Sequence, residues 1–96
     1  MPLSEVILKK RDQILGLPAN HGAENVRIFG SMARGDERVD SDLDLLVDVG
    51  PRRTPFFPGG LVADLEELLS RRVDVVTEAG LHRRLRDRIL SEAIPL

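Results

Sequence analysis

Residues 41–50, SDLDLLVDVG, constrain the fold more than any other segment, because leucine and valine alternate with aspartate along them. Alternate residues of a β-strand point to opposite faces of a sheet, so one face of this segment is apolar and the other is mainly acidic. The apolar face holds Leu43, Leu45, Val47 and Val49, and the acidic face holds Asp42, Asp44, Leu46 and Asp48. The segment is therefore predicted to be a strand with one buried face.

The flanking segments predict an α/β fold. Helical spacing of apolar residues indicates helices at 4–15, 61–72 and 81–94, and short apolar runs indicate strands at 25–30 and 73–77. The first helix is expected to end near GLPANHG, SMARG forms a short helical turn, and the glycines and prolines of residues 50–60 predict a loop. For a chain of 96 residues, this order predicts one α/β domain over residues 1–96.

Two further features of the sequence are open to more than one interpretation. In the last predicted helix, arginines surround an apolar stripe of Leu81, Leu85 and Ile89. The arginines form a solvated face, or they meet an acidic partner or the phosphates of RNA. Phe56 and Phe57, in the proline-rich loop, anchor that loop on the core or form a contact surface.

Composition narrows the classes of function. The chain has no cysteine, which excludes disulfides and thiolate metal sites. Its 14 basic and 16 acidic residues give a net charge of -2, which offers no support for a nucleic acid partner. No apolar run approaches the roughly 20 residues that span a bilayer, and the first residues lack the order of a signal peptide, so a cytoplasmic protein is expected.

The acidic residues predict a metal site. Asp42 and Asp44 project from the same strand face with Cα atoms about 7 Å apart, and Asp74 repeats the pattern in VDVV. Charges at that distance repel by about 2 kcal/mol at an effective dielectric near 20, so the cluster favours a cation. Carboxylate ligands that leave positions open for phosphates suit Mg²⁺. The alternative is a solvated strand face, because alternation is usual in any half-exposed strand.

The residues between the first two strands predict a phosphate site. Gly30 ends a strand and Ser31 begins a helical turn, so backbone N–H groups and the serine hydroxyl can face an anion. Glycine also allows close approach of the backbone. In the alternative interpretation, Gly30 only makes a tight corner and Ser31 only caps the turn.

GSMARG followed by SDLDLLV resembles the signature of the DNA polymerase β-like nucleotidyltransferase superfamily, and more narrowly that of minimal nucleotidyltransferases, the antitoxins of HEPN-domain toxins. The resemblance implies a small mixed β-sheet with helices packed on it. It also implies ATP as substrate and Mg²⁺ as cofactor, with two ions when nucleotide is bound. The implied metal ligands and catalytic residues are Asp42, Asp44 and Asp74, and the implied nucleotide-binding residues are Gly30, Ser31, Arg34 and Ser41.

Two of these residues carry finer expectations. Asp74 takes the proton of the acceptor hydroxyl or binds the second metal ion. Arg34 neutralises phosphate charge, or it braces the loop by pairing with Asp36, Asp40 or Asp42.

The function expected from the resemblance is transfer of AMP from ATP to a hydroxyl of a partner protein, a HEPN-type toxin that is thereby silenced. Two alternatives remain open. The chain is a non-catalytic module that masks the toxin, or it transfers a nucleotide to a small molecule or an RNA end. Replacement of Asp42 and Asp44 by asparagine separates catalysis from masking.

Overall fold

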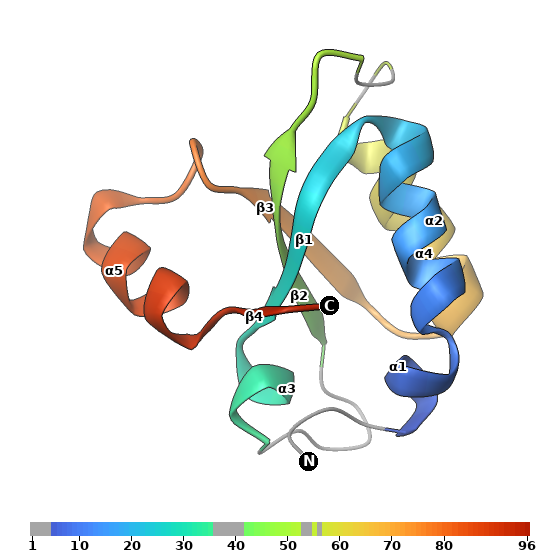
Figure 1. Cartoon of the computed structure of the whole chain (residues 1–96), viewed down its shortest axis with the longest axis horizontal. Helices are drawn as coiled ribbons and strands as arrows, with labels where there is room; N and C mark the ends of the chain where they lie inside the picture. The colour runs from blue at the N-terminus through green and yellow to red at the C-terminus, as the bar shows by residue number, and fades with distance from the viewer. Residues whose placement is uncertain (1–4, 36–41, 53–54, 56) are drawn as a thin grey trace.

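The structure is a computed structural model that describes residues 5–35, 42–52, 55 and 57–96 (Figure 1). A four-stranded sheet has the strand order β3-β2-β1-β4. Its strands are β1 (Ala23–Phe29), β2 (Leu43–Val49), β3 (Val73–Thr77) and β4 (Ile94–Pro95). The helices are α1 (Glu5–Lys9), α2 (Arg11–His21), α3 (Ser31–Arg34), α4 (Gly59–Leu69) and α5 (Arg83–Glu92). β2 is antiparallel to β1 and parallel to β3, so the predicted mixed sheet is confirmed.

Helices α2 and α4 lie side by side against one face of the sheet, and the core lies between them and the strands (Figure 1). The register sets Leu45 between Ile28 of β1 and Val75 of β3, and all three side chains are buried. The apolar face predicted for residues 41–50 is confirmed at Leu43 and Val47, which are fully buried. Alternation along β2 therefore decides which face the helices cover.

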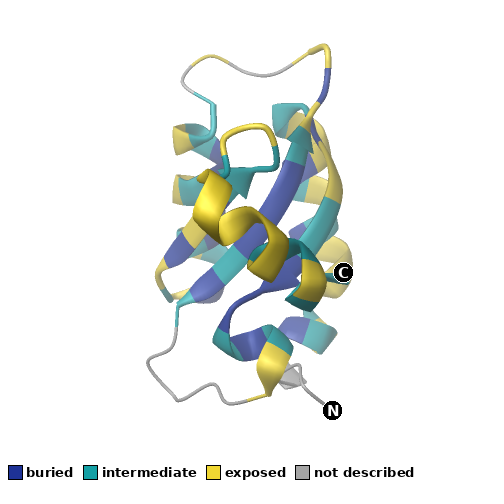
Figure 2. Cartoon of the chain, turned by 90° about the vertical axis from the view of Figure 1, so that its left-hand side faces the viewer, coloured by how far each residue is buried: buried dark blue, intermediate teal, exposed yellow. Residues whose placement is uncertain are grey.

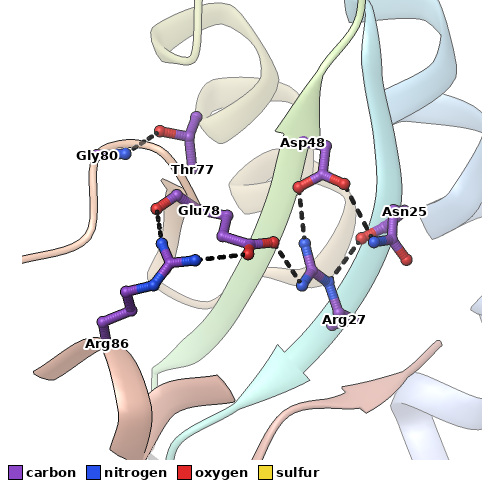
Figure 3. Close-up of polar contacts among 7 residues, drawn as sticks. All are labelled: Asn25, Arg27, Asp48, Thr77, Glu78, Gly80 and Arg86. Carbon is purple, nitrogen blue, oxygen red and sulfur yellow. Dashed lines mark hydrogen bonds and ion pairs between the residues drawn. The ribbon is translucent and has the colours of Figure 1, made fainter.

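The opposite face of the sheet carries a chain of ion pairs (Figure 3). Arg27 of β1 contacts the Asp48 carboxylate at 2.9 Å and the Glu78 carboxylate at 3.2 Å, and Glu78 also contacts Arg86 of α5 at 3.2 Å. Arg27 is the direct cross-strand partner of Leu46, which is completely buried although it lies on the acidic face. The Arg27 side chain is 12% exposed, and its head group is paired with both carboxylates, as expected for an arginine whose stem lies along a buried surface.

The first helix predicted from residues 4–15 is two helices. The chain turns at Lys10, where φ is -98° and ψ is 12°, and α2 then continues through Pro18 to His21. Pro18 removes one backbone hydrogen bond but is itself fully buried, so its packing offsets part of that loss. Gly22 ends the helix with φ at 86°, within the segment where an end was expected.

The predicted helix bounds in the second half of the chain need correction, and one strand was not predicted. Helix α4 begins at Gly59, two residues inside the predicted loop, and ends at Leu69 rather than at residue 72. The last helix spans Arg83–Glu92 rather than residues 81–94, and β4 follows it and pairs with β1. The structure also shows that the apolar stripe of the last helix is uncovered, since Leu85 is 49% exposed and α5 contains no buried residue (Figure 2).

Phe57 packs against the core, as expected for an anchor of the loop, and Phe56 lies outside the described residues. None of the helices in the described part of the chain is long and apolar enough to cross a bilayer.

We expect Leu45→Ala to lower the free energy of unfolding by about 3 kcal/mol, because it leaves a cavity between β2 and the helices. Val49→Ala, on the same strand but 39% exposed, is the matched control and should cost less than about 1 kcal/mol. Urea denaturation measures both values. Equal losses would contradict the assignment of the core face.

Candidate active site

Gly30 lies at the corner between β1 and α3, in a conformation that a side chain would not tolerate. Its φ is 77° and its ψ is -154°, a region of backbone space that is essentially restricted to glycine. A Cβ atom at this position would collide with Oδ2 of Asp44. The corner therefore brings the main chain directly against a carboxylate of β2.

Asp44 is positioned by strand register. Its direct neighbours are Phe29 on β1 and Asp74 on β3, so two aspartates stand side by side on adjacent parallel strands. Burial raises the pKa of Asp44 to about 6, and the negative charges of Asp74 and Asp42 add to this effect. Arg34 lowers the same pKa and Glu92 raises it further. All four charged groups therefore act on Asp44, as expected if they surround one site.

The third predicted metal ligand, Asp42, forms an ion pair with an arginine. Asp42 lies just before β2, and its Oδ1 atom is 3.3 Å from Nε of Arg72. Within the described residues, no group of three or more His, Cys, Asp or Glu side chains is arranged to hold a metal ion. The predicted metal centre of Asp42, Asp44 and Asp74 is thus not preformed and stays a prediction.

The chemistry of these side chains nevertheless fits a hard cation. The available donors are carboxylate oxygens, and their repulsion at Asp44 is what a divalent ion would relieve. The ion pair that holds Asp42 is solvent-exposed, with 84% of the Arg72 side chain accessible. Such pairs contribute at most about 1 kcal/mol, so Arg72 is a weak competitor for Asp42.

Three of the four predicted nucleotide-binding residues, Gly30, Ser31 and Arg34, lie together around the corner between β1 and α3. Ser31 begins α3, directly after the Gly30 corner, and Arg34 ends the same helix. Arg34 Nη1 lies 3.3 Å from Oε2 and 3.4 Å from Oε1 of Glu92. Ser41, the fourth predicted nucleotide-binding residue, lies outside the described residues, as do Asp36 and Asp40, two of the expected ion-pair partners of Arg34.

Glu92 is a residue of this site that the sequence pattern did not reveal. It ends α5, and its Oε1 atom accepts a hydrogen bond of 3.0 Å from the Gly30 N–H. One signal was available: a glutamate in the last turn of a helix opposes the helix dipole, so its position calls for another explanation. The partner at Gly30 is 62 residues away and is not visible in any local pattern.

The family model of the nucleotidyltransferase domain matches residues 8–96. The chain belongs to this family. Among curated relatives, the nucleotidyltransferase domain is 39% identical over 82 residues to a candidate protein adenylyltransferase of Methanocaldococcus jannaschii, covering 85% of this chain and 88% of the relative. It is 36% identical over 75 residues to protein adenylyltransferase MntA of Thermococcus cleftensis, covering 76% and 74%.

Similar solved structures support the same family assignment. A candidate minimal nucleotidyltransferase is 52% identical, with a TM-score of 0.83 and coverage of 96% of this chain and 94% of that one. A toxin–antitoxin structure with AMP-PNP is 20% identical, with a TM-score of 0.75 and coverage of 88% and 69%, a likeness that shows the fold alone. The resemblance carried by GSMARG and SDLDLLV is confirmed, and the nucleotidyltransferase domain has the polymerase β-like fold.

We expect Gly30→Ala to destabilise the nucleotidyltransferase domain by about 1–3 kcal/mol, because alanine is strained at this φ and its Cβ meets Asp44. The matched control is Gly16→Ala in α2, where a Cβ meets nothing within 4 Å. That variant should be stabilised by about 0.5–1 kcal/mol. Chemical denaturation compares the two, and tolerance of alanine at residue 30 would refute the close approach.

We expect Asp44→Asn to stabilise the metal-free domain at pH 8 and to have little effect near pH 4. The folded state holds the Asp44 proton up to a pKa of about 6, whereas the unfolded chain releases it near 3.8. Wild-type stability therefore falls as pH rises between these values, and the loss is complete above the folded pKa.

Thermal unfolding in EDTA across this pH range measures the effect. A stability difference between Asp44→Asn and wild type that does not change with pH would show that charge on Asp44 is not its cause.

Proposed function

We propose that this nucleotidyltransferase domain transfers AMP from ATP to a hydroxyl group of a partner protein, a HEPN-type toxin, and thereby acts as its antitoxin. The observation that carries the proposal is the packing of Gly30 against Asp44, with Asp74 in the adjacent register position. A main-chain corner for phosphates and paired carboxylates then lie at one end of the sheet. The names of the curated relatives favour a protein as acceptor.

In the proposed reaction, an acceptor hydroxyl oxygen forms a bond to the α-phosphorus of ATP. The bond between that phosphorus and the bridging oxygen breaks, and pyrophosphate leaves with the electron pair. Asp74 takes the hydroxyl proton; its exposed position on β3 suits a group that meets an acceptor on another protein's surface.

The remaining residues bind and orient the nucleotide. Gly30 and Ser31 hold the triphosphate, and Arg34 neutralises part of its charge. Mg²⁺, held by Asp42, Asp44 and Asp74, would neutralise charge on the phosphates when bound. Loss of the proton from Asp44, whose pKa is near 6, leaves a carboxylate available as a ligand at neutral pH.

A second candidate function is masking of the toxin without chemistry. The toxin–antitoxin context of the solved relatives is compatible with both functions. The close packing around Asp44, which only a glycine at residue 30 permits, favours a functional site.

Intact-mass spectrometry tests the proposed reaction. The protein encoded beside this chain is incubated with it, ATP and Mg²⁺, and we expect a gain of one or more adenylyl groups. The Asp42→Asn, Asp44→Asn double variant should abolish the gain, because it removes the charge of two proposed ligands.

Asp48→Asn is the matched control, since Asp48 lies on the same strand and contacts Arg27 instead. Circular dichroism verifies that this variant is folded, and it should retain transfer. A stable complex that shows no mass gain would refute transfer to this protein and favour masking.

A further inference from the structure

Glu92 occupies the part of the site where a phosphate group is expected. Its Oε1 atom accepts the 3.0 Å hydrogen bond from the Gly30 N–H, and its carboxylate lies 3.3–3.4 Å from Arg34 Nη1. The Glu92 side chain is 18% exposed and that of Arg34 is 42% exposed, so water reaches the arginine side of the contact more readily than the side at Gly30. A backbone donor and a cation, both predicted to bind phosphate, are thus bound by a carboxylate of the same chain.

A carboxylate and a phosphate group make the same kinds of contact. Both accept charge-assisted hydrogen bonds from backbone N–H groups and from guanidinium. A carboxylate and a phosphate group that use the same N–H donor compete for it, so the carboxylate must leave before the phosphate group binds. Glu92 also opposes triphosphate binding through its charge, because it adds negative charge near Asp44 and so repels an incoming triphosphate.

The placement of Glu92 is poorly explained by the stability of α5 alone. A negative side chain in the last turn of a helix is unfavourable for the helix dipole. Helix α5 also buries none of its residues. Among the described residues, it is further attached to the sheet through the contacts of Arg86 with Glu78 and through the short strand β4. The end that carries Glu92 is joined to β4, where Ile94 pairs with Ile28, so release of the Gly30 N–H calls for rotation of the Glu92 side chain rather than a shift of the sheet.

We propose that Glu92 is a positioning residue that holds Gly30 and Arg34 in the nucleotide-free protein and is displaced when a triphosphate binds. Glu92 thereby lowers nucleotide affinity and links nucleotide binding to the contact between α5 and the Gly30 corner. The inference rests on the proposed function, since it takes a nucleoside triphosphate as the ligand of this corner.

Isothermal titration calorimetry with AMP-PNP and Mg²⁺ tests the proposal. We expect Glu92→Gln to bind AMP-PNP about 5- to 10-fold more tightly than wild type, because the neutral amide competes less well for the Gly30 N–H and Arg34. A structural role predicts the opposite sign, since loss of the brace would loosen the corner and weaken binding. Equal or weaker binding by Glu92→Gln overturns the proposal.

Two further variants make the result specific. Glu78→Gln removes the same charge near the other end of α5, where Glu78 contacts Arg27 and Arg86, and it should leave the affinity unchanged. An equal gain in Glu78→Gln would mean a general charge effect and would also overturn the proposal. Glu92→Asp keeps the charge but shortens the reach to Gly30, so its affinity should lie between those of wild type and Glu92→Gln.

The amide resonance of Gly30 supplies a readout that does not depend on catalysis. In ¹⁵N spectra, the chemical shift of this resonance should differ between Glu92→Gln and wild type. In wild type, it should also change when inorganic tripolyphosphate is added. If AMP-PNP fails to bind but tripolyphosphate binds more tightly to Glu92→Gln, the proposed function fails and the competition by Glu92 stands. If AMP-PNP binds equally to all variants, the competition by Glu92 fails, and the nucleotide binding that the proposed function requires stands.

Discussion

The packing of the Gly30 main chain against the Asp44 carboxylate is the contact on which the rest of the site depends. It requires a residue without a side chain at the end of β1, and strand register then places Asp74 on the other side of Asp44. The same corner turns the Gly30 N–H toward Glu92 and starts the helix that carries Arg34. One contact between two strands thus organises residues from α3, β3 and α5.

This arrangement holds negative charges together at a cost that the hydrophobic core offsets. Asp44 lies between Leu43 and Leu45, and both leucines are completely buried on the opposite face of β2. Burial of each leucine contributes about 1.5–3 kcal/mol, which is enough to keep the intervening carboxylate in place despite its repulsion from Asp74. The sheet therefore maintains an electrostatically strained site, as functional sites commonly do.

Local patterns predicted some elements well and others poorly. β3 was predicted with its exact bounds, and the alternation of apolar and acidic residues identified β2 and its core face. β4 was missed because two residues are too few to show a period, although Pro95 is compatible with an edge strand. Spacing identified an apolar stripe in the last helix, but spacing does not reveal whether another element covers such a face, and in the structure α5 contains no buried residue.

The sequence by itself determined the mixed α/β architecture, the glycine corner and the pairing of acidic residues on one sheet face, because these follow from local periodicity and from a short motif. The tertiary structure alone decided how the charges are shared. Asp42 turns to Arg72, Asp48 binds Arg27, and the Gly30 N–H is paired with Glu92. Such choices depend on distances between segments far apart in the chain, and Coulomb interactions follow those distances rather than the order of residues.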